Sequence, residues 1–326
     1  MKIRFLWIVG VLVLGGYLLF KGCSRDQVQK KSQISQESIS VQDREHKEAP
    51  IDAQKNPSTE LLKLLDVMGV QHDGSLQSIM QATQKAWLRQ AGKERWQIGD
   101  QFAQKRDIVM PLLTNMGFVH EQKVTQNQYD YALVLGATMQ RMRSRVAYLL
   151  KQVTAGIHVG KIIVLTGLRD RSNDIETESV ILGTTQTDLP IKKDWHLTGA
   201  LPATETDMIK LIFEQTDFPD VFKSIPVEFI NTPVQMAKDG TLRRPNTADT
   251  VHAWLATSPV PGSCLAVSNQ PYNLYQDTII RNSLPSTFML ETVGAGVDIS
   301  EKAQKQENIA VFLDTLARYI FAKTQQ

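Results

Sequence analysis

The chain has 326 residues, of which 42% are hydrophobic and 21% charged, values typical of a folded globular protein. Its formal net charge of +2, from 36 basic and 34 acidic side chains, lacks the basic excess of nucleic-acid binders, so we predict no nucleic-acid partner. Two cysteines, Cys23 and Cys264, are too few for a disulfide framework or a cysteine-rich zinc site.

An uncharged apolar run covers residues 5–20 and follows Lys2 and Arg4. As a helix it would span about 24 Å, against roughly 30 Å for a hydrocarbon core, and flanking basic side chains can make up the difference. We therefore expect residues 1–23 to form a signal anchor, with a cleaved signal or lipidation at Cys23 as the alternatives. The basic residues before the run favour a single pass through the inner (cytoplasmic) membrane with the body on the periplasmic side.

Two segments of contrasting composition follow the apolar run. Residues 24–57 are polar and nearly free of aromatics, which predicts a disordered tether between membrane and body. Apolar residues then recur at helical spacing, for example at Leu61, Leu65 and Met68, so residues 58–128 are expected to be a helical segment. We assign this segment a packing role and no chemistry.

Short apolar runs alternate with helical patterns over residues 129–326. Strands are expected at 131–135, 161–166, 227–230, 264–268 and 287–291, and helices at 139–152, 205–215, 247–257, 272–282 and 308–323. This alternation predicts an α/β domain with a doubly wound, mainly parallel, Rossmann-like sheet. Residues 168–203 fit the rhythm poorly and are expected to be an insertion after the second strand.

Ligands of such sheets bind outside the carboxyl ends of the strands. The first of these ends, Gly136-Ala137 before a helix, is a generic anion seat, but it lacks the dinucleotide glycine fingerprint and the Walker lysine. The chain also has no Gly-x-Ser-x-Gly elbow, and no two of its histidines stand at metal-ligand spacing, so we predict no metal site.

The order of several short motifs over residues 129–293 resembles the YdcF/SanA/ElyC-like family of bacterial envelope proteins. The matching positions are Val134-Leu135-Gly136, Arg143 with Ala147, Thr166-Gly167, Glu205 with Met208, Asn246-Thr247 with Asp249, and the 268–272 stretch Ser-Asn-Gln-Pro-Tyr. The resemblance implies an envelope protein and S-adenosylmethionine as a candidate ligand. The sequence departs from the family where Asn273 and Gln276 replace its histidine and arginine, which removes an acid–base group and an anion clamp.

These observations predict a membrane-tethered envelope protein that binds a small anionic or nucleotide-like ligand at the strand ends. The candidate ligand-binding residues are Gly136, Ala137, Arg143, Gly167, Glu205, Asn246, Thr247, Asp249, Asn269 and Gln270. Within this set we expect Arg143, Glu205 and Asp249 to surround one hollow, with Gly136 and Gly167 presenting backbone amides. Turnover by these residues, ligand binding without turnover, and a structural or partner-binding role are the functions left open.

Overall fold

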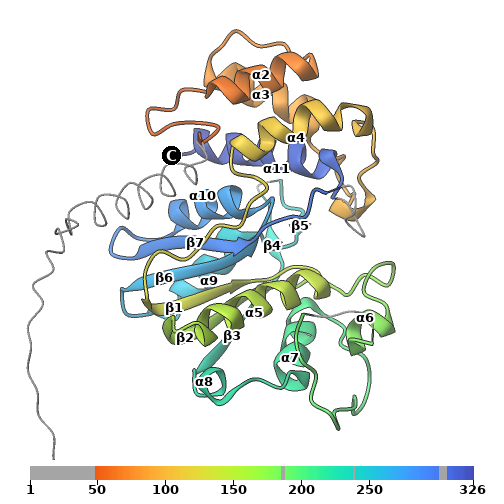
Figure 1. Ribbon diagram of the computed structural model, residues 1–326, viewed down its shortest axis with the longest axis vertical. Helices are drawn as coiled ribbons and strands as arrows, with labels where there is room; N and C mark the ends of the chain where they lie inside the picture. The colour runs from red at the N-terminus through yellow and green to blue at the C-terminus, as the bar shows by residue number, and fades with distance from the viewer. Residues whose placement is uncertain (1–47, 185–187, 238, 301–306) are drawn as a thin grey trace, which may run out of the picture. The chain divides into compact units, whose positions relative to one another are not determined.

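A computed structural model describes residues 48–184, 188–237, 239–300 and 307–326. Its centre is a five-stranded parallel sheet in the order β3-β2-β1-β6-β7 (Figure 1). The strands are β1 (Gln128–Leu135), β2 (His158–Gly167), β3 (Val227–Thr232), β6 (Ser263–Asn269) and β7 (Met289–Ala295). In the register, Leu133 of β1 lies between Ile163 of β2 and Ala266 of β6. The predicted parallel α/β sheet is confirmed.

Helices cover both faces of this sheet. They are α5 (Met139–Thr154), α6 (Glu178–Leu182), α7 (Glu205–Gln215), α8 (Asp220–Lys223), α9 (Thr247–Leu255) and α10 (Asn273–Ser283). Side chains of α5, α7 and α8 share a core with Ala132 and Val134 of β1. The alternate residues of β1, Leu133 and Leu135, share a second core with side chains of α9 and α10. Because successive strand residues point to opposite faces, β1 is apolar on both sides and the sheet is doubly wound.

A further helical layer packs beyond α10. It consists of α2 (Thr59–Met68), α3 (Leu76–Trp87), the 3₁₀ turns η1 (Arg95–Gln97) and η2 (Ala103–Lys105), α4 (Arg106–Asn115) and α11 (Ile309–Thr324). Leu61, Ile79 and Leu113 of its first helices share one buried core with Phe312 and Leu316 of α11. The helical segment expected for residues 58–128 therefore includes the last helix of the chain in its core, and residues 47–326 cluster as one compact unit.

Local sequence explains several helix ends. Ser58 accepts a hydrogen bond from the backbone N–H of Leu61, and α2 stops at Gly69, whose φ of 70° suits a residue without a Cβ. Thr204 with Asp207, and Asn246 with Asp249, form reciprocal capping boxes before α7 and α9. These helices begin where the sequence patterns place them.

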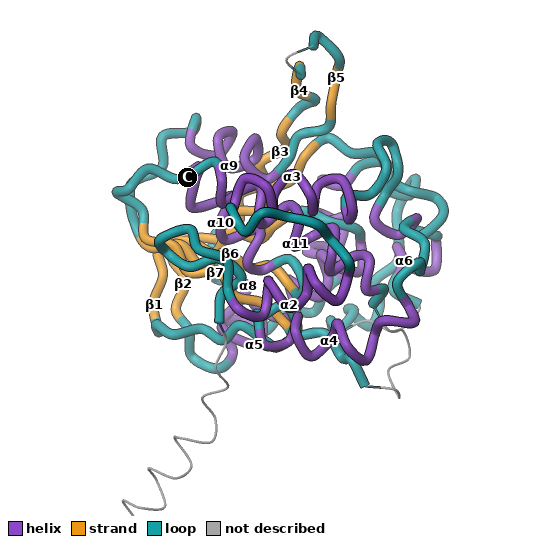
Figure 2. Tube along the Cα trace, turned by 90° about the horizontal axis from the view of Figure 1, so that it is seen from above, coloured by secondary structure: helices purple, strands orange, loops and turns teal. Residues whose placement is uncertain are grey.

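Three features differ from the sequence expectations. The insertion at 168–203 contains α6, and an isolated antiparallel bridge between Asp170 and Thr204 joins its beginning to the residue before α7. The antiparallel pair β4 (Gln235–Met236) and β5 (Leu242–Arg243) was not predicted, because strands this short carry no apolar run; Figure 2 shows it projecting from the rest of the fold. Ile51, expected in the tether, is buried and bridges to Pro57.

The predicted anchor at residues 5–20 and most of the tether lie outside the described residues. Within the described ranges, no helix has the length and apolar character needed to cross a bilayer.

Candidate functional site

The strand order changes direction between β1 and β6, at the point where α5 leaves on one face of the sheet and α10 on the other. The carboxyl ends of these two strands, at Leu135 and Asn269, flank the crevice in which ligands of doubly wound sheets bind. The side chains around this edge form two groups. One surrounds Arg169 and contains the predicted residues Gly136, Ala137, Gly167 and Glu205, and the other was not predicted from the sequence.

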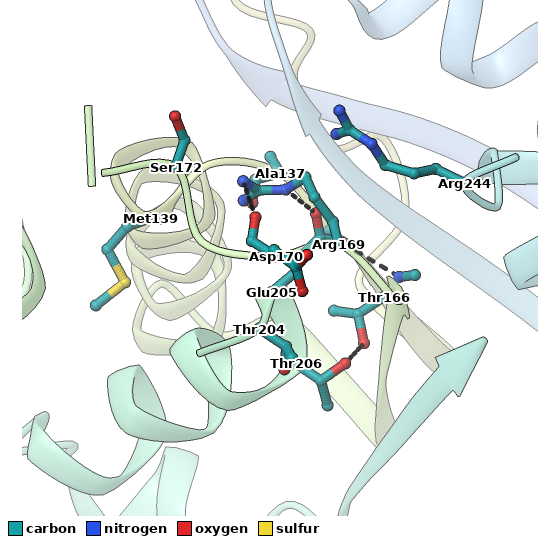
Figure 3. Close-up of polar contacts among 12 residues, drawn as sticks. Ala137, Met139, Thr166, Arg169, Asp170, Ser172, Thr204, Glu205, Thr206 and Arg244 are labelled. Atoms are coloured by element: carbon teal, nitrogen blue, oxygen red, sulfur yellow. Dashed lines mark hydrogen bonds and ion pairs between the residues drawn. The ribbon is translucent and has the colours of Figure 1, made fainter. Parts of the chain in front are cut away.

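Arg169, which follows β2, is the centre of the first group. Its guanidinium donates to Glu205 Oε2 (3.0 Å), to both carboxylate oxygens of Glu176 (2.7 and 2.9 Å) and to the backbone oxygen of Ala137 (3.0 Å). Figure 3 shows Arg169 between Ala137 and Glu205. Glu176 also accepts the backbone N–H of Met139 and so caps α5. With its donors committed in this way, Arg169 joins α5, β2 and α7 and has little left to offer a ligand.

Glu205, the first residue of α7, is buried beside Arg169. Its Oε1 accepts the backbone N–H of Gly167 at 3.2 Å, and its Oε2 accepts from Arg169. Burial raises the pKa of Glu205, and the charge and hydrogen bond of Arg169 offset part of that rise. Both oxygens are therefore engaged within the protein.

Gly136 and Gly167 are required by close packing. A Cβ built on Gly136 would lie 2.1 Å from Glu205 Oε1, and one on Gly167 would lie 2.4 Å from Pro245 Cγ. The N–H of Gly136 donates to Leu165 O at 2.7 Å, and that of Gly167 donates to Glu205. The two glycines thus direct their amides to protein acceptors and not to the crevice, unlike the sequence expectation.

Arg143 and Arg145, on α5, are both buried but serve different neighbours. Arg143 donates to the backbone oxygens of Val180 and Ile181 and so holds α6. Arg145 donates to Asn269 Oδ1 (3.0 Å) and to the backbone oxygens of Leu135 (2.7 Å) and Gly136 (2.8 Å), which ties the end of β1 to the end of β6. The crevice arginine of α5 is therefore Arg145, and the guanidinium proposed from sequence, that of Arg143, is committed to α6.

The predicted residues near α9 act as its cap. Asn246 Oδ1 accepts the N–H of Asp249, whose carboxylate accepts the N–H of Asn246 and two hydrogen bonds from Arg243 at 2.6 and 3.0 Å. Thr247, the first residue of the helix, accepts from the hydroxyl of Thr250 through its backbone oxygen. Among the described residues no hydrogen bond or ion pair joins any two of Arg143, Glu205 and Asp249, and each is held by its own partners: Arg143 by α6, Glu205 by Arg169, and Asp249 by Arg243.

Asn269 and Gln270 end β6 and lie where expected at the crevice. Asn269 accepts from Arg145 and donates to Gln270 O. Gln270 donates through Nε2 to the backbone oxygens of Gly117 (2.9 Å) and His120 (2.8 Å), and the peptide bond to Pro271 is cis. These contacts attach the end of β6 to the segment that leads into β1.

The second group, here named the Tyr272 cluster, consists of Arg95, Arg141, Tyr272 and Asn273. The Arg95 and Arg141 guanidinium carbons lie 4.6 and 4.7 Å from the centre of the Tyr272 ring, which is 1% exposed. Burial would lower the pKa of Arg141, but the neighbouring Tyr272 and Glu307, which Arg141 contacts at 2.8 Å, together raise it. Two cationic side chains from different layers therefore meet at the start of α10.

The start of α10 is not capped by a side chain. The side chain of the cap residue, Tyr272, accepts no N–H, and its backbone oxygen accepts only from Gln276. The backbone N–H groups of Asn273, Leu274 and Tyr275 have no hydrogen-bond acceptor within the described part of the chain. Asn273 is 2% exposed, and neither its Oδ1 nor its Nδ2 has a partner there. Because unpaired buried polar groups are costly, such a cluster is typical of a place where water or a ligand completes the hydrogen bonds.

Sequence reasoning could find only part of this cluster. Asn273 and Gln276 were noticed as departures from the family pattern, and both are buried with unpartnered side-chain atoms. The Ser268 hydroxyl is also buried without a hydrogen-bond partner among the described residues. By strand alternation Ser268 lies on the same face of β6 as Cys264 and Ala266, the face that α10 covers. Arg95 carries no local signal, because it belongs to a helical segment whose position over the sheet is decided by long-range packing.

Comparison with protein-family models, with characterised protein sequences and with solved structures finds no match to this chain. Within the described ranges, no group of three His, Cys, Asp or Glu side chains is placed to hold a metal ion. A cavity of about 290 Å³ lies away from the strand ends, in the loop before β7, where Leu284, Phe288 and Leu290 line it. Its one charged side chain, Arg281, is paired with Asp277, so this cavity offers no evident chemistry.

Proposed function

We propose that the chain binds a small anionic ligand at the crevice between β1 and β6, and that the ligand's anionic group sits at the start of α10 within the Tyr272 cluster. The observation that carries this proposal is the convergence of Arg95 and Arg141 on an uncapped helix N-terminus. An exposed helix N-terminus attracts anions through its free N–H groups and its dipole, and guanidinium groups strengthen the attraction.

The local charge distribution supports an anion at this place. Burial, and after it the positive charge of Arg141, lowers the pKa of Arg145 to about 9. Arg95 contributes to the same field, while its nearest carboxylate, Asp314, is 3.7 Å away and shared with Arg89 and Arg318. An anion beside Arg95 and Arg141 would relieve this repulsion.

The donors favour a phosphoryl group among anions. Three consecutive N–H groups and two guanidinium forks offer more hydrogen bonds than the two oxygens of a carboxylate can use conveniently, whereas a phosphate presents three terminal oxygens. Nucleotides and phosphorylated small molecules belong to this class. S-adenosylmethionine, suggested by the family resemblance, would have to use its carboxylate there.

Binding without turnover is the form of the proposal we favour. Asn273 and Gln276 do not exchange protons near neutral pH, and both oxygens of Glu205 are already hydrogen-bonded. The Glu205 carboxylate is therefore not free to act as a general acid or base, and within the Tyr272 cluster the hydroxyl of Tyr272, which has no hydrogen-bond partner among the described residues, is the one group of that kind. The proposed setting is the one expected from sequence: a membrane-tethered envelope protein of the YdcF-like type with its body on the periplasmic side.

The test uses the full chain and three probes: inorganic pyrophosphate, AMP and S-adenosylmethionine. Pyrophosphate should raise the melting temperature of the wild type, because a ligand that binds only the native state stabilises it. Arg141→Gln should weaken binding by about tenfold or more, the loss expected for a hydrogen bond to a charged group, and Arg141→Lys should bind with intermediate affinity. Arg281→Gln, which removes an arginine from the last turn of α10, at the opposite end of the helix from Tyr272, is the matched control and should bind like the wild type.

The proposal would be refuted if none of the probes stabilised the wild type, or if Arg141→Gln bound pyrophosphate as tightly as Arg281→Gln. Unfolding of each variant in urea distinguishes a lost contact from a misfolded protein.

A partner-binding role is the second candidate, and it has its own observation. Met236 and Leu242 pair across β4 and β5, and they are 73% and 71% exposed on the projecting hairpin. Exposed apolar side chains on such a ribbon are typical of contact surfaces. A photo-crosslinking residue at position 236 should form a protein adduct in cells if this role is correct, and its absence there would remove the support.

A further inference from the structure

We propose that residues 89–98 of the helical layer act as a clamp over the anion site, and that the ion pair between Glu94 and Arg244 positions this clamp. This inference rests on the proposed function, since it concerns how the same ligand is retained. It assigns Glu94 and Arg244 as positioning residues, because they act on the ligand only through Arg95.

The clamp brings Arg95 to the sheet from a different layer. Behind it, the buried carboxylate of Asp314 on α11 accepts from Arg89 and Arg318 and lies 3.7 Å from Arg95 Nε. Burial opposes ionisation of Asp314, but the bonds and charge of Arg318 and its neighbours outweigh this and lower its pKa. The Asp314 carboxylate is therefore ionised, and Arg95 lies farther from it than Arg89 and Arg318 do.

Arg95 also has spare hydrogen-bonding capacity. Its Nε is buried and makes no hydrogen bond to any described residue. Its guanidinium carbon is 4.6 Å from the ring centre of Tyr272, the residue that precedes the uncapped first turn of α10. A small shift of the clamp would thus let Arg95 contact a ligand without giving up Asp314.

The Glu94–Arg244 ion pair connects the clamp to the sheet side of the crevice. Arg244 follows β5 and precedes the cap of α9, and Figure 3 shows its side chain extending on the side of the crevice opposite Met139. Glu94 is the cap residue of η1 and forms a reciprocal capping box with Gln97. The pair therefore fixes the residue immediately before Arg95.

Access to the site requires this connection to open. Tyr272 and Asn273 are almost completely buried, and Arg95 is part of what covers the ring. A ligand that reaches the first turn of α10 must pass the clamp, and the clamp must open again for release. Because about half of the Arg244 side chain is exposed, its ion pair is weak enough to open readily.

The experiment measures the dissociation rate of pyrophosphate from the full chain. Glu94→Gln and Arg244→Gln should each speed dissociation about two- to fivefold, the range expected for a solvent-exposed ion pair. Neither variant should appreciably change the free energy of unfolding. The charge-exchanged protein, with Glu94→Arg and Arg244→Glu together, should return toward the wild-type rate, which a merely structural role of either residue would not predict. Lys85→Gln removes an exposed charge on α3, in the same helical layer but outside the clamp, and is the control that should leave the rate unaltered.

The outcomes separate the two proposals. If pyrophosphate binds the wild type and Arg141→Gln weakens binding, but Glu94→Gln and Arg244→Gln release it at the wild-type rate, the clamp is refuted and the anion site stands. If both single variants speed release but the charge exchange does not restore it, the ion pair is not the positioning element. If pyrophosphate fails to bind the wild type, the proposed function and the clamp are overturned together.

Discussion

Replacing Gly136 by alanine should destabilise the protein chiefly through a collision with Glu205, with a second close approach of 3.0 Å to the backbone oxygen of Leu165. Gly136 has ordinary backbone angles, so alanine brings no conformational strain of its own, but its Cβ would lie 2.1 Å from Glu205 Oε1 and 2.9 Å from its Cδ. Contacts between non-bonded heavy atoms normally lie near 3.5 Å, so the carboxylate must move by about 1 Å or more. That movement breaks the bonds to Gly167 N (3.2 Å) and Arg169 Nε (3.0 Å).

The magnitude follows from these contacts. Overpacking a close-packed site costs about 1–3 kcal/mol, and a hydrogen bond to a charged group contributes about 1.5–3 kcal/mol. Since the displaced carboxylate can keep part of its attraction to the Arg169 guanidinium, we expect Gly136→Ala to lower the free energy of unfolding by about 2–4 kcal/mol. In a Glu205→Ala background the added methyl group meets no carboxylate and only the close approach to Leu165 O (3.0 Å) remains, so the same change should cost about 1 kcal/mol.

Urea unfolding of the full chain, followed by circular dichroism, measures this double-mutant cycle. Gly99→Ala is the matched control, because its Cβ would meet nothing closer than Gln101 Oε1 at 3.4 Å; it should change stability by less than about 1 kcal/mol. An equal cost of Gly136→Ala with and without the Glu205 carboxylate would refute the reasoning.

Three further predictions use the same unfolding assay. Arg143→Met should lower the free energy of unfolding by about 2–4 kcal/mol, because it leaves two backbone oxygens of α6 without their donor. It should leave pyrophosphate affinity unchanged; a loss of affinity would show that Arg143 contributes to the ligand site. Asn246→Ala should cost about 1 kcal/mol through the lost cap of α9, and no loss would contradict that role. The pKa of Asp314 lies below its unfolded value of 3.8, so its stabilisation is complete above about pH 4 and is lost as the pH falls through the lower, folded pKa; a stability difference between wild type and Asp314→Asn that stays constant down to pH 2 would contradict this.

Local patterns predicted the elements of the sheet domain well where they are long and regular. The helix expected at 205–215 matches α7 as observed, since its apolar spacing and the Thr204 cap agree. The strand expected at 287–291 begins later and extends to Ala295, because pairing with β6 continues through Gly294, a residue with no apolar signal. β4 and β5 are too short to leave a pattern.

The candidate site was only partly predictable. Glu205, Asn269 and Gln270 lie at the crevice, as expected from their places after strands or at a helix start. Among the arginines of α5, sequence could not tell which faces α6 and which faces the strand ends, because that choice depends on how the helix is rotated against the sheet. In the structure Arg145 donates to the end of β1 at the crevice, and Arg143 donates to α6.

The order of apolar runs and helical patterns, by itself, determined that this chain folds around a mainly parallel sheet, whereas the strand order that places β1 beside β6 came from the tertiary structure. Hydrophobic periodicity is a local property, and burial of both sheet faces follows from it. Only the tertiary structure decided that Arg95 from the helical layer meets Arg141 above Tyr272. That meeting depends on packing of α11 against α3 and α10, and contacts between residues so far apart in the chain leave no trace in local sequence.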